Sequence, residues 1–139
     1  MKVYLAAPYV RKDEIKARAE ELREAGIEVT SSWLEEPHKP SIQMHELTHE
    51  EHQEYAMNDV RDVLAADLLV FFTDPTKAII RAGRHVEFGM AVARYMPIVV
   101  VGCEFENIFH HLSNVTHYES WTEAKQMLVA YAKSLDAGR

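Results

Sequence analysis

Glu87 is the residue of this chain whose sequence context best suits chemistry. It stands four residues after Gly83, and residues 82–91 predict a glycine turn with Glu87 on the first turn of the following helix. Backbone amides at a helix N-terminus favour an anion, so a carboxylate there could stay ionised and act as a nucleophile. The spacing alone, however, fits an ordinary helix-terminal carboxylate better than a catalytic one.

Basic residues gather in predicted loops near the same region: Arg11, Lys12, Lys77, Arg81 and Arg84. Arginine forks and backbone amides recognise phosphate, and this grouping is notable in a chain of 139 residues with a formal charge of -7. We expect these loops to favour a small ligand that carries a phosphate group. A nucleic-acid polymer is not expected, because its binding depends on many lysines and arginines.

Three histidines, His45, His49 and His52, recur at helical spacing and could line one face that holds a metal ion. The stretch is polar throughout, so a solvated lid or helix entry explains it better, and we expect no metal. The loop after the first predicted strand also lacks the Gly-x-Gly-x-x-Gly pattern of nicotinamide and flavin enzymes. The sequence therefore predicts no cofactor.

The elements that must position these residues alternate along the chain. Apolar or β-branched runs predict strands at residues 2–6, 27–33, 67–73, 98–101 and 115–118, and helical spacing predicts helices at 13–25, 48–65, 84–95 and from about 121. Residues 35–47 carry two prolines and predict a loop or lid. This pattern indicates an α/β fold in which residues 1–139 form one domain, a doubly wound, flavodoxin- or Rossmann-like parallel sheet of about five strands with helices on both faces.

In such a sheet, ligands bind beyond the carboxyl ends of the strands. The candidate site therefore gathers residues 7–12, 31–33 and 74–83. With 47% hydrophobic residues and Cys103 as its single cysteine, the chain suits one buried core without an internal disulfide. No signal or membrane-spanning stretch is evident, and we expect a cytoplasmic protein.

The chain resembles the nucleoside 2-deoxyribosyltransferase-like superfamily, including the 2′-deoxynucleoside 5′-monophosphate N-hydrolases, over about two thirds of its length. Three marks carry the resemblance. Tyr4 lies in a first-strand run, Asp59 stands eight residues before the Asp67 that opens the third strand, and Glu87 lies between Gly83 and Gly89.

The resemblance implies that Glu87 is the nucleophile, that Asp59 assists departure of the base, and that Tyr4 orients Glu87. Retaining cleavage of a glycosidic bond needs such a pair of carboxyl groups. The expected reaction releases the base of a 2′-deoxynucleoside 5′-monophosphate through a covalent glycosyl-enzyme on Glu87. Asp62, one turn further along, competes with Asp59 for the second role.

Two alternatives stay open: base exchange by a nucleoside 2-deoxyribosyltransferase, and a non-catalytic nucleotide-binding or sensing domain. The family hydrolases carry a glycine- and serine-rich phosphate loop where this chain has Ala7-Pro8-Tyr9-Val10, and a serine near the place of Arg81. The transferases typically use an amide-bearing tail, whereas residues 134–139 contain no asparagine or glutamine. The latter departure weakens the transferase alternative.

The residues expected to contact substrate or its phosphate are Ala7, Pro8, Tyr9, Arg11, Trp33, Asp74, Arg81, Gly83 and Arg84. Tyr9, Trp33 and Phe72 are the candidates for stacking on the base. Sites in this family usually lie near subunit contacts, so we expect a homodimer or a larger homo-oligomer. Residues 105–112 are a possible interface segment.

Overall fold

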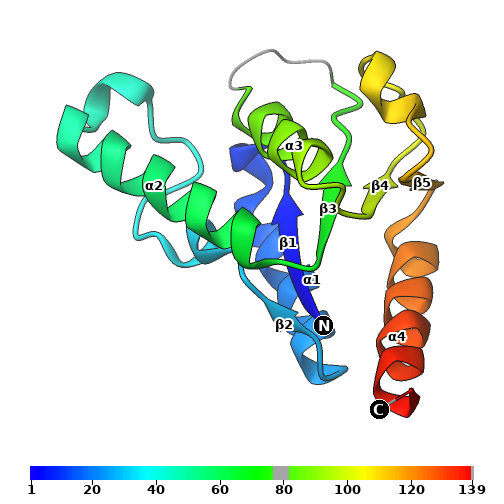
Figure 1. The fold of residues 1–139 in the computed structure, drawn as a ribbon. Helices are drawn as coiled ribbons and strands as arrows, with labels where there is room; N and C mark the ends of the chain where they lie inside the picture. Colours follow the sequence, from blue (N-terminus) through cyan, green and yellow to red (C-terminus); the bar gives the residue numbers. More distant parts are fainter. Residues whose placement is uncertain (77–81, 139) are drawn as a thin grey trace.

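The computed structural model describes residues 1–76 and 82–138, and these form an α/β fold built on one parallel sheet (Figure 1). The sheet has five strands in the order β2-β1-β3-β4-β5, with bounds β1(Lys2–Ala6), β2(Glu28–Val29), β3(Leu68–Phe72), β4(Ile98–Val101) and β5(Val115–Tyr118). The chain winds outward from β1 in one direction and from β3 in the other. The switch point, where ligands bind in such sheets, therefore lies between β1 and β3.

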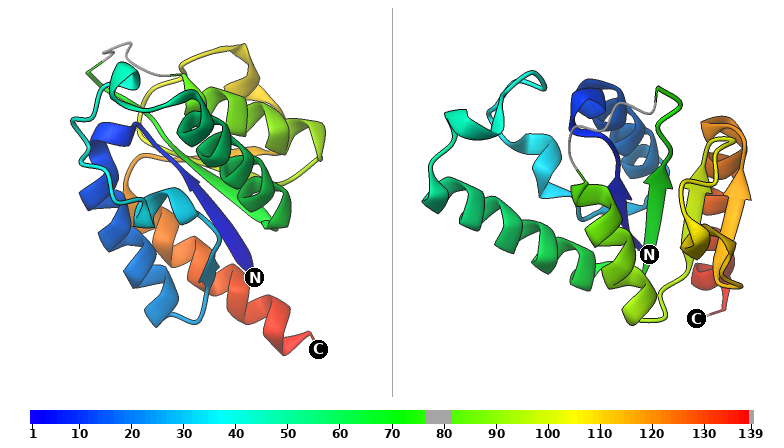
Figure 2. Two further views of the ribbon diagram at one scale, coloured as in Figure 1. Left: turned by 90° about the vertical axis from the view of Figure 1, so that its left-hand side faces the viewer. Right: turned by 90° about the horizontal axis from the view of Figure 1, so that it is seen from above.

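The helices cover both faces of the sheet, as the alternating pattern predicts (Figure 2). Two of them, α1(Lys12–Glu24) and α4(Trp121–Ala137), lie on one face, and α2(His49–Ala65) and α3(Gly83–Ala93) lie on the other. Every side chain of β3 is buried, which is why its sequence is apolar throughout rather than alternating. The core is centred on β1 and β3, and the cleft-forming helices α2 and α3 pack beside the ends of these strands.

Local signals fix most helix boundaries. The predicted capping box of α2 is present, because the Thr48 side chain accepts from the Glu51 amide and the Glu51 side chain accepts from the Thr48 amide. The Ser120 side chain caps α4 by accepting from the Glu123 amide. The helix α1 stops before Gly26, whose φ of +82° suits glycine.

The second strand is much shorter than predicted. We expected a strand over residues 27–33, but β2 comprises only Glu28–Val29, and a 3-10 helix, η2(Ser32–Glu35), follows it. Side-chain hydrogen bonds replace the strand ladder here: Leu5 donates its amide to Ser31 Oγ at 2.7 Å, and Ser32 donates its amide to Asp62 Oδ2 at 2.9 Å. The turn carries Trp33 and Glu36 toward the carboxyl end of β1.

Among the described residues, three further 3-10 segments lie between these elements, and one of them is η4(Ile108–His111) between β4 and β5. Of the other two, η1(Tyr9–Arg11) connects β1 to α1, and η3(Met44–Glu46) lies in the predicted loop or lid before α2. The helix α3 begins at Gly83, one residue earlier than predicted. Glu87 therefore stands on the second turn of α3, and its placement on the first turn is wrong.

Candidate active site

Glu87 and Tyr4 meet at the floor of a cleft between α2 and α3. Glu87 is 8% exposed, and the fully buried Tyr4 of β1 donates its hydroxyl to Glu87 Oε2. Burial raises the pKa of Glu87 to about 8, although the hydrogen bond from Tyr4 lowers it. Burial and the nearby carboxylates raise the pKa of Tyr4, so the phenol keeps its proton and remains a donor.

This geometry corrects the reason for which Glu87 was expected to be ionised. The first-turn amides of α3 do not hold its carboxylate, because Glu87 lies beyond that turn. Removal from water, which disfavours the charged form, is the larger effect. The hydroxyl of Tyr4 is the contact that favours the carboxylate.

Asp59 of α2 supplies a second carboxyl group to the same cleft. Its Oδ1 is buried and has no hydrogen-bond partner among residues 1–76 and 82–138. Burial, followed by the charges of Glu36 and Asp62, raises the pKa of Asp59 to about 7. A carboxyl group that titrates near neutral pH can both give and take a proton there.

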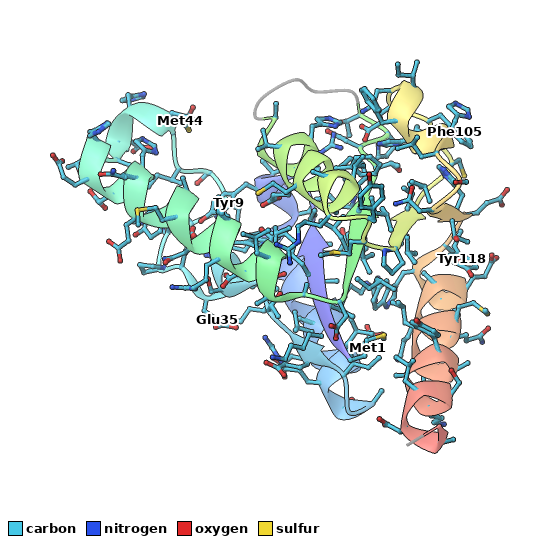
Figure 3. The ribbon with its side chains drawn as sticks, viewed as in Figure 1. Met1, Tyr9, Glu35, Met44, Phe105 and Tyr118 are labelled. Atoms are coloured by element: carbon cyan, nitrogen blue, oxygen red, sulfur yellow. The ribbon has the colours of Figure 1, made fainter. Side chains whose placement is uncertain are left out.

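The cleft has a volume of about 230 Å³. Four parts of the chain line it: the loop after β1 (Ala7 and Tyr9), the segment from η2 to α2 (Trp33, Glu36, His38, Ile42, Met44 and Leu47), α2 (His52, Tyr55, Ala56 and Asp59) and the start of α3 (Gly83, Arg84 and Glu87). In Figure 3, Tyr9 lies near the carboxyl end of β1 and Met44 lies near the N-terminal end of α2. The predicted lid, residues 35–47, thus contributes a wall of the cleft.

Specific hydrogen bonds hold this wall in place. His38 Nε2 and the Tyr55 hydroxyl lie 2.7 Å apart, and His52 Nε2 lies 2.7 Å from the main-chain oxygen of Met44. On the other side, the buried Lys12 ammonium donates to the main-chain oxygens of Glu36 and His38. The lid is therefore anchored to α1 as well as to α2.

Glu36 is a cleft residue that the sequence reasoning missed. Its carboxylate accepts from the Tyr9 hydroxyl at 3.4 Å, and burial raises its pKa. Its charge also raises the pKa of Asp59 and of Glu87. In the sequence Glu36 belongs to a Glu-Glu-Pro run that predicts only a polar loop, so no signal distinguished it.

The carboxylate of Asp62 forms hydrogen bonds that hold the fold. Asp62 is 7% exposed, and its carboxylate accepts from both the amide and the hydroxyl of Ser32. Arg61 pairs with Asp62 at 3.4 Å, rather than with Asp59. Of the two neighbouring carboxyl groups on α2, Asp59 is the one that lines the cleft.

Arg11 and Asp74 lie elsewhere, in a separate and larger cleft of about 590 Å³ that also contains Phe72. The Arg11 guanidinium donates to the main-chain oxygen of Thr73 at 2.9 Å and pairs with Glu14 at 2.7 Å. The Asp74 carboxylate accepts from the amide and the hydroxyl of Thr76. The structure therefore does not bring Arg11 and Asp74 to Glu87. Phe72 is 1% exposed and packs on Trp121.

Arg84 does line the Glu87 cleft, but its charge is already paired. Its two terminal nitrogens contact Glu106 at 2.5 and 2.9 Å, and its side chain is 9% exposed. The other two predicted cations, Lys77 and Arg81, lie outside the described residues.

The remaining predicted contacts form the wall beside the loop after β1. Tyr9 and Trp33 lie with their ring centres 5.8 Å apart, tilted by 40°. Trp33 is 5% exposed and donates its Nε1 to the main-chain oxygen of Leu5 at 2.9 Å, so it acts as a fixed wall. Ala7 and Gly83 line the cleft, whereas Pro8 precedes η1 and does not.

Of the three histidines considered for a metal site, His45 and His49 are exposed, whereas His52 lines the cleft. His45 lies in η3 while His49 and His52 lie in α2, so the three do not share one helix face. Within residues 105–112, exposed apolar side chains are present, as a subunit contact requires: Phe105, Ile108, Phe109 and Leu112. The oligomeric state stays a prediction. No described helix is long and apolar enough to cross a membrane.

Comparison with known proteins places this geometry in context. The structure is similar to that of the CMP N-glycosidase BcmB of Clostridium botulinum, with 24% sequence identity, coverage of 92% of this chain and 98% of that one, and a TM-score of 0.60. It is also similar to a 2-deoxyribosyltransferase of Bacillus psychrosaccharolyticus, with 20% identity, 90% coverage of each chain and a TM-score of 0.68. A conserved protein of Enterococcus faecalis shares 21% identity over 94% of this chain and 87% of its own, with a TM-score of 0.52. At these identities the likeness concerns the fold.

A search of curated protein sequences gives no match. The family model described as nucleoside 2-deoxyribosyltransferase, in contrast, matches residues 3–130, which include β1, the lid, both cleft-lining helices and most of α4. Tyr4, Asp59 and Glu87, which resemble the family marks, thus lie within a match that covers nearly the whole chain. The protein belongs to the nucleoside 2-deoxyribosyltransferase family.

Proposed function

We propose that the protein cleaves the N-glycosidic bond of a 2′-deoxynucleoside or its 5′-monophosphate through a glycosyl ester on Glu87. The observation that carries this proposal is the hydrogen bond from the buried Tyr4 to Glu87, in a cleft that Asp59 also lines. Two carboxyl groups with pKa values raised toward neutrality are suited to a two-step displacement.

The protonation of the pair follows from its hydrogen bonds. Tyr4 donates to Glu87 and therefore stabilises Glu87 as the carboxylate. Asp59 Oδ1 has no donor among the described residues, so no hydrogen bond to that atom favours the charged form of Asp59. We take Glu87 as the carboxylate in the reaction because of the donor Tyr4, although its pKa of about 8, with the hydrogen bond included, lies above the value of about 7 for Asp59.

In the first step, Glu87 attacks C1′ of the sugar and forms a C1′–O bond. The bond from C1′ to the base nitrogen breaks, its electron pair leaves with the base, and Asp59 gives the base a proton. In the second step, Asp59 takes a proton from water, whose oxygen attacks C1′ and displaces Glu87 as the carboxylate. The products are the free base and the deoxyribose or its 5-phosphate.

The acceptor in the second step distinguishes hydrolysis from base exchange. The N-glycosidase and the 2-deoxyribosyltransferase to which the structure is similar represent the two outcomes. The preference for a 5′-monophosphate that the sequence suggests stays a prediction.

The decisive experiment incubates the protein with deoxynucleosides and their monophosphates, with and without a second free base, and separates the products by chromatography. We expect release of base by the wild type, none by Glu87→Gln, and unchanged release by Glu24→Gln, which alters an exposed glutamate of α1. Mass spectrometry of acid-quenched wild type should find the sugar on the peptide containing Glu87. Undiminished turnover in Glu87→Gln would exclude the mechanism, and a swapped nucleoside would show that a base is the acceptor.

A further inference from the structure

We propose that Glu36 is a specificity-determining residue, which selects substrates without a 5′-phosphate. The inference rests on the proposed function and concerns the same cleft. It is opposite to the preference that the basic residues of the sequence suggest, and it follows from where the charges of the cleft lie.

Glu36 places a third carboxyl group in the cleft, beside Asp59 and Glu87. The hydrogen bond from Tyr9 directs the carboxylate toward the loop after β1. The Lys12 ammonium holds the main-chain oxygen of the same residue, which fixes the start of the lid. Glu36 is therefore a positioned charge on the lid, and not a mobile surface residue.

The described cations near this cleft use their donors in contacts within the protein, although the charge of Lys12 lowers the pKa of Glu36. Lys12 is bound to main-chain oxygens, Arg11 turns away to Thr73 and Glu14, and Arg84 forms a bidentate pair with Glu106. Arginine and lysine recognise phosphate through donors that these contacts already use. Within residues 1–76 and 82–138, the cleft thus presents three carboxyl groups and no permanent cation without an acidic or carbonyl partner.

A phosphate group and the Glu36 carboxylate repel each other, and the low dielectric of a partly buried cleft strengthens that repulsion. A hydroxyl or amino group, in contrast, can donate to a carboxylate. Glu36 consequently disfavours a nucleotide and accepts a donor from the sugar or base of an uncharged nucleoside. Specificity of this kind comes from repulsion of the nucleotide as much as from attraction of the nucleoside.

The test measures kcat and KM for a deoxynucleoside and for its 5′-monophosphate, in the wild type and in Glu36→Gln. We expect the wild type to prefer the nucleoside, and Glu36→Gln to reduce that preference by about tenfold, mainly through a lower KM for the monophosphate. The matched control is Glu35→Gln, since Glu35 is the adjacent residue, is 54% exposed and pairs with Lys16 at 3.2 Å outside the cleft. This control should leave the ratio of the two substrates unchanged.

The inference is overturned if the wild type prefers the monophosphate, or if the ratio is the same in Glu36→Gln. Should Glu36→Gln fail to fold, Glu36→Asp retains the charge and must keep the nucleoside preference, while Glu36→Ala must reduce it. If the wild type cleaves neither substrate, the proposed function fails separately. Calorimetric binding of the same two compounds to the wild type and to Glu36→Gln then decides the role of Glu36.

Discussion

The hydroxyl of Tyr4 donates to the carboxylate of Glu87, a residue 83 positions further along the chain. One lies on the second residue pair of the β1–β3 ladder and the other on the helix that follows β3. The two meet because β1 and β3 are neighbours at the switch point of the sheet. Tyr4, a strand residue, thereby favours the ionised form of Glu87, a helix residue.

Replacement of Tyr4 by phenylalanine should lower kcat/KM by roughly 100-fold, the usual scale for loss of one positioned donor. The hydrogen bond from Tyr4 lowers the pKa of Glu87, so its loss raises that pKa further. The reaction needs ionised Glu87, and the acid limb of the pH–rate profile should therefore move to higher pH. Tyr118→Phe on β5 is the control, and an unshifted profile in Tyr4→Phe would contradict the role of the hydroxyl.

Stability should depend on pH through the same carboxyl groups. The folded-state pKa values of Glu87 and Asp59 are raised to about 8 and about 7, so the folded protein binds more protons than the unfolded chain between pH 4 and 8. The favourable contribution of these two groups to the free energy of unfolding is present at about pH 4. It is lost as the pH rises through 7 and 8.

Glu87→Gln and Asp59→Asn remove the cost of charging these buried groups. We expect the melting temperature of each variant to equal that of the wild type near pH 5 and to exceed it by several degrees near pH 9, a gain of about 1–3 kcal/mol. Thermal unfolding at the two pH values measures this difference. Equal shifts at both pH values would show that the groups are not titrating in the folded protein.

Truncation of the two carboxyl groups of α2 should affect different properties: stability for Asp62 and turnover for Asp59. Asp62→Ala leaves the partly buried amide and hydroxyl of Ser32 without their acceptor, which should lower the free energy of unfolding by about 1–3 kcal/mol. Asp59→Ala removes a group whose Oδ1 has no partner in the described structure, and it should lower turnover instead of stability. Urea unfolding together with the base-release assay separates the two, and a reversal of the pattern would assign Asp62 to the chemistry.

Gly102 is a position where a side chain should not be tolerated. Its φ is +129°, and a Cβ there would lie 1.8 Å from Thr73 Oγ1. Gly102→Ala should therefore destabilise the protein by about 2–4 kcal/mol through backbone strain and overlap at the ends of β3 and β4.

The matched control is Gly89→Ala, because a Cβ on Gly89 would meet nothing within 4 Å. This change in the interior of α3 should stabilise the helix by about 0.5–1 kcal/mol. Chemical denaturation of both variants checks the pair of expectations. A destabilised Gly89→Ala would indicate that another molecule approaches the outer face of α3.

Much of the fold could be predicted from the sequence because its signals are local. The apolar run of β3 and the capping box of Thr48 and Glu51 each determine an element within a few residues. The second strand could not be predicted, since Ser31 and Ser32 make their decisive hydrogen bonds with Leu5 and Asp62, about thirty positions away.

The candidate site shows the same limit. Spacing and resemblance led to Tyr4, Asp59 and Glu87, and the structure brings all three to one cleft or its floor. Spacing does not give the direction of a side chain: Arg11 lies in the expected loop, but its guanidinium donates to Thr73 at the end of β3. Glu36 was missed because only the turn at η2 carries it into the cleft.

That turn has a consequence for the behaviour of the protein in concentrated solution. The strand β2 is an edge of the sheet, and unpaired edge strands can recruit strands from other molecules and start aggregation. With only Glu28–Val29 in the strand, and the chain turning away at Ser32, the edge offers few amides and carbonyls to an incoming strand. The shortening that delivers Glu36 to the cleft thus also protects this side of the sheet from self-association.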